Sequence, residues 1–213
     1  MSTNIDYWEK VLANPIVSYK KLIEVERVYL QKNVTPHSKV LEIGCGNGRN
    51  IESLISITKN IVGIDNDPQA VKDAKKRLAK FLTVTILEAD ALALPFEDQS
   101  FDFVILLDTL VNFKENKLKS LLEMKRVLSK TGKVIISVYS EDAFDNRMTM
   151  YKQIEVPIER VDGTKIIFDK SVGANESEQF SKDQIFELSK QAKLKLVDCI
   201  KVEKIAYICK FIR

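Results

Sequence analysis

Short, nearly continuous apolar runs alternate with helical patterns through the middle of the sequence. Five runs have the length and composition of buried strands, at residues 39–43, 61–64, 84–87, 101–107 and 134–139. Segments with apolar residues at helical spacing separate them, including one that begins with Asp67-Pro68 and one predicted over about 116–128. Strands that alternate with helices in this rhythm form a parallel sheet covered on both faces. The sequence therefore predicts an α/β fold of the doubly wound, Rossmann-like kind.

The two ends of the chain follow other patterns. Apolar spacing predicts one or two helices before about residue 31, and Pro36 ends that pattern. Near the other end, Ser181 and Gln184 match a capping box that opens a helix running to about residue 192. Two strands, about 194–200 and 203–211, follow with so short a connection that they must be antiparallel.

Residues 140–180 interrupt the alternation. Two apolar segments, 154–160 and 165–169, flank the sequence VDGT, in which Asp162-Gly163 is a hairpin signal. Pro157 restricts the first of these strands to an edge. We interpret the chain as one domain, 1–213, composed of N-terminal helices (1–33), a core (34–139), an inserted hairpin segment (140–180), and a closing helix and strand pair (181–213).

Composition excludes several classes of protein. The N-terminal sequence MSTNIDYWEK lacks the apolar centre of a signal peptide, and the longest strongly apolar run, FVILL, is too short to cross a bilayer. The three cysteines, Cys45, Cys199 and Cys209, lack CxxC spacing, which argues against a disulfide framework and a zinc site. The net charge of +3 does not by itself imply a nucleic-acid partner. We expect a cytoplasmic protein without a metal.

The sequence VLEIGCGNGRN, residues 40–50, places Gly44, Gly46 and Gly48 directly after the first predicted strand. A tight strand-to-helix turn needs positive φ angles, and bare backbone lets a ligand approach closely. In an open parallel sheet, such a ligand lies outside the carboxyl ends of the strands. A tight turn without any ligand is the alternative.

Three acidic residues accompany the glycines. Asp65 ends the second strand, where a carboxylate can accept both hydroxyls of a ribose that lies over the glycine turn. Asp90 follows the third strand and could accept from an exocyclic amine, although a turn-forming aspartate is also compatible. Glu42 puts a charge inside the first strand, and buried charges are costly unless paired, so we expect it to meet a ligand ammonium or backbone donors.

Two familiar nucleotide motifs are missing. A dinucleotide-binding GxGxxG would need glycine at position 49, which is Arg, and no GK[ST] follows for a P-loop. Over about residues 34–139 the sequence instead resembles the class I S-adenosylmethionine-dependent methyltransferases, through VLEIGCGNGRN, VGIDNDP, EADALALPFEDQSFDFVI and MKRVLSKTGKVIISV. LPFEDQSFDFV is most similar to the branch of the ubiquinone/menaquinone-biosynthesis methyltransferases. That family has a seven-stranded sheet whose last strand is antiparallel, which suits the predicted terminal strand pair.

The resemblance implies a cofactor site for S-adenosylmethionine. The residues that it assigns to the cofactor are Glu42, Gly44, Cys45 and Gly46 near the methionine part, Asp65 at the ribose, Asn66, Asp90 and Ala91 at the adenine, and Leu106 and Leu107 beyond the fourth strand. Relatives often carry two histidines or other polar residues after that strand, where LLDTLVNF offers Asp108 and Asn112. Neither their role nor the substrate class therefore transfers.

The acceptor is less well defined. The candidate acceptor contacts are Tyr19, Asp108, Asn112, Tyr139 and Arg147, within the N-terminal helices, the carboxyl edge of the sheet and residues 140–180. His37, the only histidine, precedes the first strand and is interpreted as a loop residue rather than a base. A sulfonium is an activated methyl donor, so alignment of a nucleophile is the main requirement and a strong base is optional.

Several functions remain open from the residues alone. The leading hypothesis is methyl transfer to a small-molecule or side-chain acceptor, because no NPPY-like tetrad or Pro-Cys nucleophile is present. A non-catalytic S-adenosylmethionine-binding regulator or subunit and an RNA methyltransferase are the alternatives. A nucleotide-dependent oxidoreductase is disfavoured by Arg49 and by the lack of residues for a separate substrate domain.

Overall fold

The computed structural model describes residues 4–172 and 176–213. Residues 1–3 and 173–175, which the sequence analysis assigned to the N-terminal helices and to the inserted segment, lie outside the described residues.

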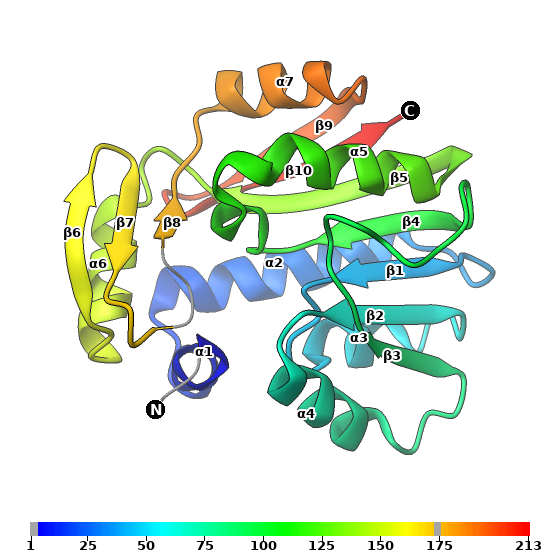
Figure 1. Cartoon of the computed structure of the whole chain (residues 1–213), viewed down its shortest axis with the longest axis horizontal. Helices are drawn as coiled ribbons and strands as arrows, with labels where there is room; N and C mark the ends of the chain where they lie inside the picture. Colours follow the sequence, from blue (N-terminus) through cyan, green and yellow to red (C-terminus); the bar gives the residue numbers. More distant parts are fainter. Residues whose placement is uncertain (1–3, 173–175) are drawn as a thin grey trace.

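A seven-stranded sheet with the strand order β3-β2-β1-β4-β5-β10-β9 forms the centre of the molecule (Figure 1). Its strands are β1 (Val40–Ile43), β2 (Ile61–Asp65), β3 (Val84–Glu88), β4 (Phe101–Leu106), β5 (Leu128–Tyr139), β9 (Lys195–Val202) and β10 (Ala206–Ile212). The pairs from β3 to β5 are parallel, and β10 is antiparallel to both of its neighbours. The predicted mostly parallel sheet with an antiparallel last strand is confirmed.

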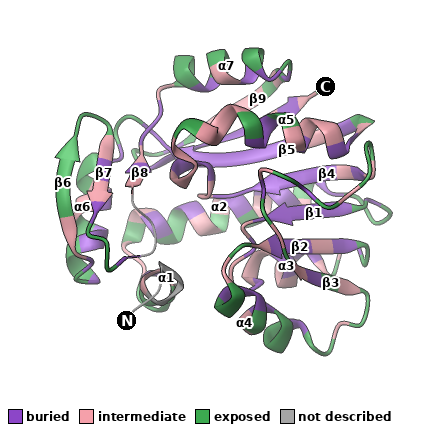
Figure 2. Cartoon of the chain, viewed as in Figure 1, coloured by how far each residue is buried: buried purple, intermediate pink, exposed green. Residues whose placement is uncertain are grey.

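Helices surround the central sheet, and one of them, α6 (Phe144–Gln153), lies to one side of it (Figure 1). They are α1 (Asn4–Ala13), α2 (Val17–Asn33), α3 (Arg49–Leu54), α4 (Pro68–Leu78), α5 (Lys117–Val127), α6 (Phe144–Gln153) and α7 (Lys182–Gln191), with short 3₁₀ helices η1 (Leu110–Asn112) and η2 (Lys114–Asn116). In Figure 1, α5 and α7 lie in front of the sheet and α2 passes behind it. The central strands are accordingly buried on both faces: all four residues of β1 are buried, and the strands are mostly purple in Figure 2.

Side-chain caps fix where two helices begin. The Asp67 carboxylate accepts hydrogen bonds from the amides of Gln69 (2.8 Å) and Ala70 (3.3 Å), which satisfies two free donors at the start of α4. Ser181 and Gln184 form a complete capping box at the start of α7. Both caps were predicted from the sequence and both are confirmed.

Residues 140–180 differ from the expectation. The predicted hairpin is present as β6 (Ile158–Asp162) and β7 (Lys165–Phe168), but β8 (Glu176–Glu178) extends it to a three-stranded antiparallel sheet. The helix α6 was not predicted, and residues 154–157 connect it to β6 instead of belonging to the strand. The strand β6 is an edge strand as predicted, although Pro157 precedes it rather than lying within it. This smaller sheet lies to one side of the central one, at the left of Figure 1.

Candidate functional site

A cavity of about 800 Å³ opens at the carboxyl ends of β1, β2 and β4. The strand order reverses there, because β1 has β2 on one side and β4 on the other. Ligands of doubly wound sheets bind at such a switch point. Residues of α1 and α2, including Trp8 and Tyr19, line the cavity as well.

The glycine turn forms one wall of the cavity. Gly44, Gly46 and Gly48 have φ angles of 68°, 52° and 81°, as the sequence predicted. A Cβ atom at Gly44 would lie 2.6 Å from Thr109 Oγ1, and one at Gly48 would lie 2.7 Å from Leu78 Cδ1. The turn therefore accommodates no larger residue at these two positions, and its backbone stays open to a ligand.

Asp65 stands beside this turn. Its Oδ2 accepts from the Gly46 amide at 2.9 Å, and its Oδ1 accepts from the Asp67 amide at 3.0 Å. Burial raises the pKa of Asp65, and these amide hydrogen bonds oppose the rise. Because each carboxylate oxygen can accept more than one hydrogen bond, Asp65 keeps acceptor capacity for a pair of ligand hydroxyls.

Glu42 lies under the turn rather than on the cavity wall. Only 1% of its surface is exposed, and its Oε1 accepts from Asn50 Nδ2 at 2.9 Å. Its buried Oε2 has no hydrogen-bond partner among the described residues. Burial raises the pKa of Glu42 to about 7. The partner is thus a side-chain amide, where the sequence analysis expected backbone donors or a ligand ammonium.

A second polar cluster occupies the cavity wall beyond β4. Tyr19 donates its hydroxyl to Asp108 Oδ2 at 2.9 Å, and Ser137 Oγ lies 2.5 Å from Glu26 Oε1 and 3.4 Å from Asp108 Oδ1. Asp108 has a φ of 51°, and its amide donates to Ser137 Oγ at 3.0 Å. Burial raises the pKa values of Glu26, Asp108 and Tyr19. The Tyr19 ring stacks against that of Trp8, with centroids 6.2 Å apart.

The charges around the cavity are mainly negative. The acidic lining residues are Glu9, Glu26, Asp65, Asp67, Asp90 and Asp108, and the basic ones are Arg49, Lys114 and Lys170. Such a lining favours a cationic ligand over an anionic one.

Most predicted site residues meet in this cavity. Those that line it are Gly44, Cys45, Gly46, Asp65, Asn66, Asp90, Ala91, Leu107, Tyr19, Asp108 and Asn112. Asp90 is held in a turn, with its Oδ1 accepting from the Leu92 amide at 2.8 Å. That contact fits the alternative interpretation of Asp90 and leaves its other oxygen available.

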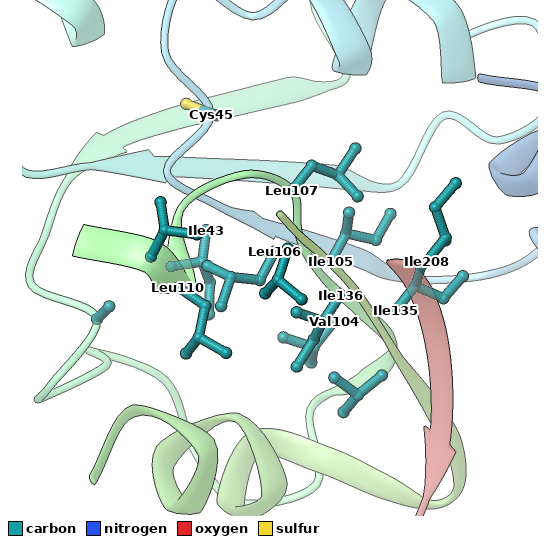
Figure 3. Packing of buried hydrophobic residues seen from close by; sticks show 14 of the residues in the cluster. Ile43, Cys45, Val104, Ile105, Leu106, Leu107, Leu110, Ile135, Ile136 and Ile208 are labelled. Atoms are coloured by element: carbon teal, nitrogen blue, oxygen red, sulfur yellow. The ribbon is translucent and has the colours of Figure 1, made fainter. Parts of the chain in front are cut away.

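Besides Glu42, three predicted contacts lie outside the cavity wall. Leu106 is fully buried and packs among the strand residues of the core, with Leu107 beyond it (Figure 3). Tyr139 and Arg147 are also fully buried, and the guanidinium lies 4.7 Å from the centroid of the Tyr139 ring. Arg147 donates to Gln179 Oε1 and to the Ser177 carbonyl, both at 2.8 Å, so it ties α6 to β8 and the residue after it.

Other cavity residues were not singled out from the sequence. Glu26 belongs to a helical pattern that gives no sign of a functional role, and Thr109 is recognisable only by its contact with Gly44. Among the described residues between 140 and 180, only Lys170 and Ser171 line the cavity. In the described part of the chain, no cluster of histidine, cysteine and carboxylate side chains has the arrangement of a metal site. No described helix combines the length and apolar character needed to span a bilayer.

Comparisons with known proteins agree with this architecture. Residues 41–136 match the family described as "Methyltransferase domain". An uncharacterised protein of Methanocaldococcus jannaschii is 36% identical over 133 residues, which are 62% of this chain and 57% of that protein. The demethylmenaquinone methyltransferase of Staphylococcus aureus is 30% identical over 152 residues, 68% of this chain and 63% of that enzyme. The matches therefore span less than two thirds of these curated relatives.

A solved structure shares the whole fold. The 1,6-didemethyltoxoflavin N1-methyltransferase of Burkholderia thailandensis, solved with 1,6-didemethyltoxoflavin and S-adenosylhomocysteine bound, superposes with a TM-score of 0.69. The match covers 95% of this chain and 81% of that one at 14% identity. Together with the sheet order and the glycine turn, these matches confirm that the chain belongs to the class I S-adenosylmethionine-dependent methyltransferases, in the branch related to the menaquinone methyltransferases.

Proposed function

We propose that the protein transfers a methyl group from S-adenosylmethionine to a small-molecule or side-chain acceptor. The observation that carries the proposal is the single cavity at the carboxyl edge of the sheet. It joins the glycine turn and Asp65 to a separate polar wall that contains Asp108 and Tyr19. One side of the cavity can hold a nucleoside cofactor while the other receives an acceptor.

The residues present fit this cofactor. Asp65 would accept its ribose hydroxyls, and the open backbone at Gly44–Gly46 would lie against its methionine part. Asn66, Asp90 and Ala91 would surround the adenine. The excess of acidic side chains around the cavity suits the positive charge of a sulfonium.

When bound, the cofactor supplies an activated methyl group on its sulfonium. The protein then has to align an acceptor atom and exclude water, and alignment alone can lower a barrier by about 7–11 kcal/mol. Trp8, Tyr19 and Phe113 provide apolar and aromatic surface for that purpose on the acceptor side.

Two considerations favour a small acceptor over RNA. The acidic lining of the cavity would repel a phosphate backbone. The demethylmenaquinone and didemethyltoxoflavin methyltransferases are named for small acceptors. The cytoplasmic location stays a prediction, based on the reduced cysteines expected from their number and spacing.

A labelled-methyl assay tests the proposal. The protein is incubated with S-adenosylmethionine carrying a labelled methyl group and a deproteinised metabolite extract, and labelled products are followed by chromatography. We expect a labelled small molecule whose formation depends on the protein and is lost in Asp65→Ala. If S-adenosylhomocysteine binds but neither the extract nor total RNA becomes labelled, the protein is a non-catalytic binder and the proposal is wrong. Label found only in RNA would contradict the acceptor class.

A further inference from the structure

Two carboxylates face the cavity on the acceptor side, and Arg49 is the basic lining residue whose charge acts on both of them. Glu26, on α2, is 3% exposed, and Asp108 follows β4. The Ser137 hydroxyl lies between them, 2.5 Å from Glu26 Oε1 and 3.4 Å from Asp108 Oδ1. Both residues line the same cavity as the glycine turn. The proposed function does not by itself require either of them.

Glu26 has unused acceptor capacity. Its Oε1 is bonded to Ser137, but no donor in the described part of the chain reaches its Oε2. Oε2 is not one of the fully buried atoms that lack a partner, and Glu26 lines the cavity, so a donor of a bound ligand can reach this oxygen. This side chain therefore points to a ligand with donors.

The neighbouring groups determine what kind of ligand would be bound. The titratable and charged groups that act on the pair are Tyr19 from α2, Glu42 from β1 and Arg49 from α3. Arg49 forms no salt bridge among the described residues, and Tyr19 already donates to Asp108. The wall thus offers hydrogen-bond acceptors and a surplus of negative charge. A protonated amine matches both properties, whereas a carboxylate would be repelled and a neutral hydroxyl would leave the charge uncompensated.

We propose that Glu26 and Asp108 bind the protonated amine of the acceptor, and that Glu26 takes its proton. This inference rests on the proposed function and identifies its acceptor as an amine. An N–H bond of the ammonium breaks and an O–H bond forms at the Glu26 carboxylate, which leaves a neutral nitrogen with a free lone pair to accept the methyl group. Asp108 retains its charge and holds the nitrogen near that position. Burial raises the pKa of Glu26, which makes its carboxylate a stronger proton acceptor.

Binding measurements with two matched pairs of probes test this inference without knowledge of the natural acceptor. Each probe is an aza analogue of the cofactor whose nitrogen carries an extra arm. In the first pair the arm is 2-aminoethyl or propyl, and in the second it is 3-aminopropyl or butyl. We expect that in at least one of the two pairs the probe with the amine arm binds at least about tenfold more tightly than the probe with the alkyl arm of the same length. The amine gains a charged hydrogen bond that the alkyl arm cannot form.

Two variants identify the residues responsible. Glu26→Gln and Asp108→Asn keep the side-chain shape and should each reduce the amine-to-alkyl affinity ratio by at least about fivefold. The affinity for S-adenosylhomocysteine should change less than about twofold. Glu24→Gln is the matched control: it removes the same charge from an exposed position on α2 and should leave the ratio unchanged. Thermal unfolding checks that each variant is folded.

The outcomes separate the two proposals. Equal affinity for amine and alkyl arms, or an amine preference that survives in both variants, would overturn the assignment of the carboxylate pair. If S-adenosylhomocysteine itself does not bind the wild-type protein, the proposed function fails. If it binds and the amine preference is absent, only this inference fails.

Discussion

Gly44 and Gly163 both adopt a left-handed backbone conformation, but their surroundings differ. Gly163, with a φ of 56°, has open space where a Cβ would be, and Gly44, with a φ of 68°, has Thr109 Oγ1 at 2.6 Å. An alanine at either position pays the conformational cost, of about 1–2 kcal/mol. At Gly44 it must also displace Thr109, which donates to the Leu107 carbonyl at 2.8 Å.

Gly44→Ala should therefore lower the free energy of unfolding by about 1–3 kcal/mol more than Gly163→Ala does. It should also weaken the binding of S-adenosylhomocysteine, because the turn must shift. Urea unfolding and calorimetry of the two variants check both statements. Equal destabilisation by the two substitutions would show that the contact with Thr109 is not a constraint.

Glu42 predicts a pH dependence of stability. Its folded pKa of about 7 is above the ordinary value of 4.5, so the native state binds more protons than the unfolded state between these values. Its stabilising contribution is fully present below pH 4.5 and is lost as the pH rises through 7. The glutamine in Glu42→Gln cannot ionise, so the variant does not lose this contribution to its free energy of unfolding as the pH rises. Between pH 4.5 and 8, the unfolding free energy of the variant should gain up to about 3 kcal/mol relative to wild type.

Urea unfolding of wild type and Glu42→Gln at several pH values measures this difference. The Glu42 charge contributes to the raised pKa of Glu26, so the difference between the two proteins reports Glu42 together with its coupling to Glu26. Glu24→Gln, on the surface, should follow the wild-type profile. A constant difference between wild type and Glu42→Gln across the range would contradict the raised pKa.

Some residues of the cavity could be predicted from the sequence and others could not. The positions of Gly44, Gly46 and Asp65 in the cavity wall were predictable, because they depend on the end of a strand and the turn that follows. The sequence did not show which of Leu106 and Leu107 faces the cavity. Neighbouring residues at a strand end point in different directions, and the structure shows that Leu107 lines the cavity (Figure 3). Glu26 lies 111 residues from its partner Ser137, and no local pattern records that contact.

The contribution of the α7 capping box to stability can be tested separately from the cavity. Ser181 accepts from the Gln184 amide at 3.2 Å, and Gln184 Oε1 accepts from the Ser181 amide at 2.7 Å. Ser181→Ala should lower the free energy of unfolding by about 1 kcal/mol. Its effect on S-adenosylhomocysteine affinity should be negligible, because α7 does not line the cavity. A loss of affinity comparable to that of a cavity variant would mean that α7 supports the site.

Helices and strands were predictable where their own residues carry the apolar spacing of a core element or a local capping motif. The parallel strands and both caps follow from apolar runs and local capping chemistry. The helix α6 was missed because FDNRMTMYKQ has little apolar periodicity and begins without a side-chain cap. Its place is fixed by long-range contacts instead, above all by Arg147 with Tyr139, Ser177 and Gln179. The three-residue strand β8 was missed for a related reason, since so short a strand depends on its partner β7.

The whole molecule brings distant parts of the chain to one cavity. Parallel strands place the residues after β1, β2, β3 and β4 at a common edge, and this follows from the strand order. The cover supplied by α1 and α2, and by Lys170 and Ser171, depends on tertiary packing and could be predicted only as a general region. The cavity and its acid-rich lining are therefore properties of the assembled fold.

The most direct test of the central claim is calorimetric titration of the protein with S-adenosylhomocysteine, with NADH as the competing nucleotide. We predict one binding site per chain for S-adenosylhomocysteine and no measurable binding of NADH. Asp65→Ala, which loses one or two charged hydrogen bonds to the ribose, should weaken the affinity at least about tenfold. Asp183→Ala, an exposed aspartate on α7, should leave it unchanged. Absence of S-adenosylhomocysteine binding, or wild-type affinity in folded Asp65→Ala, would contradict the account.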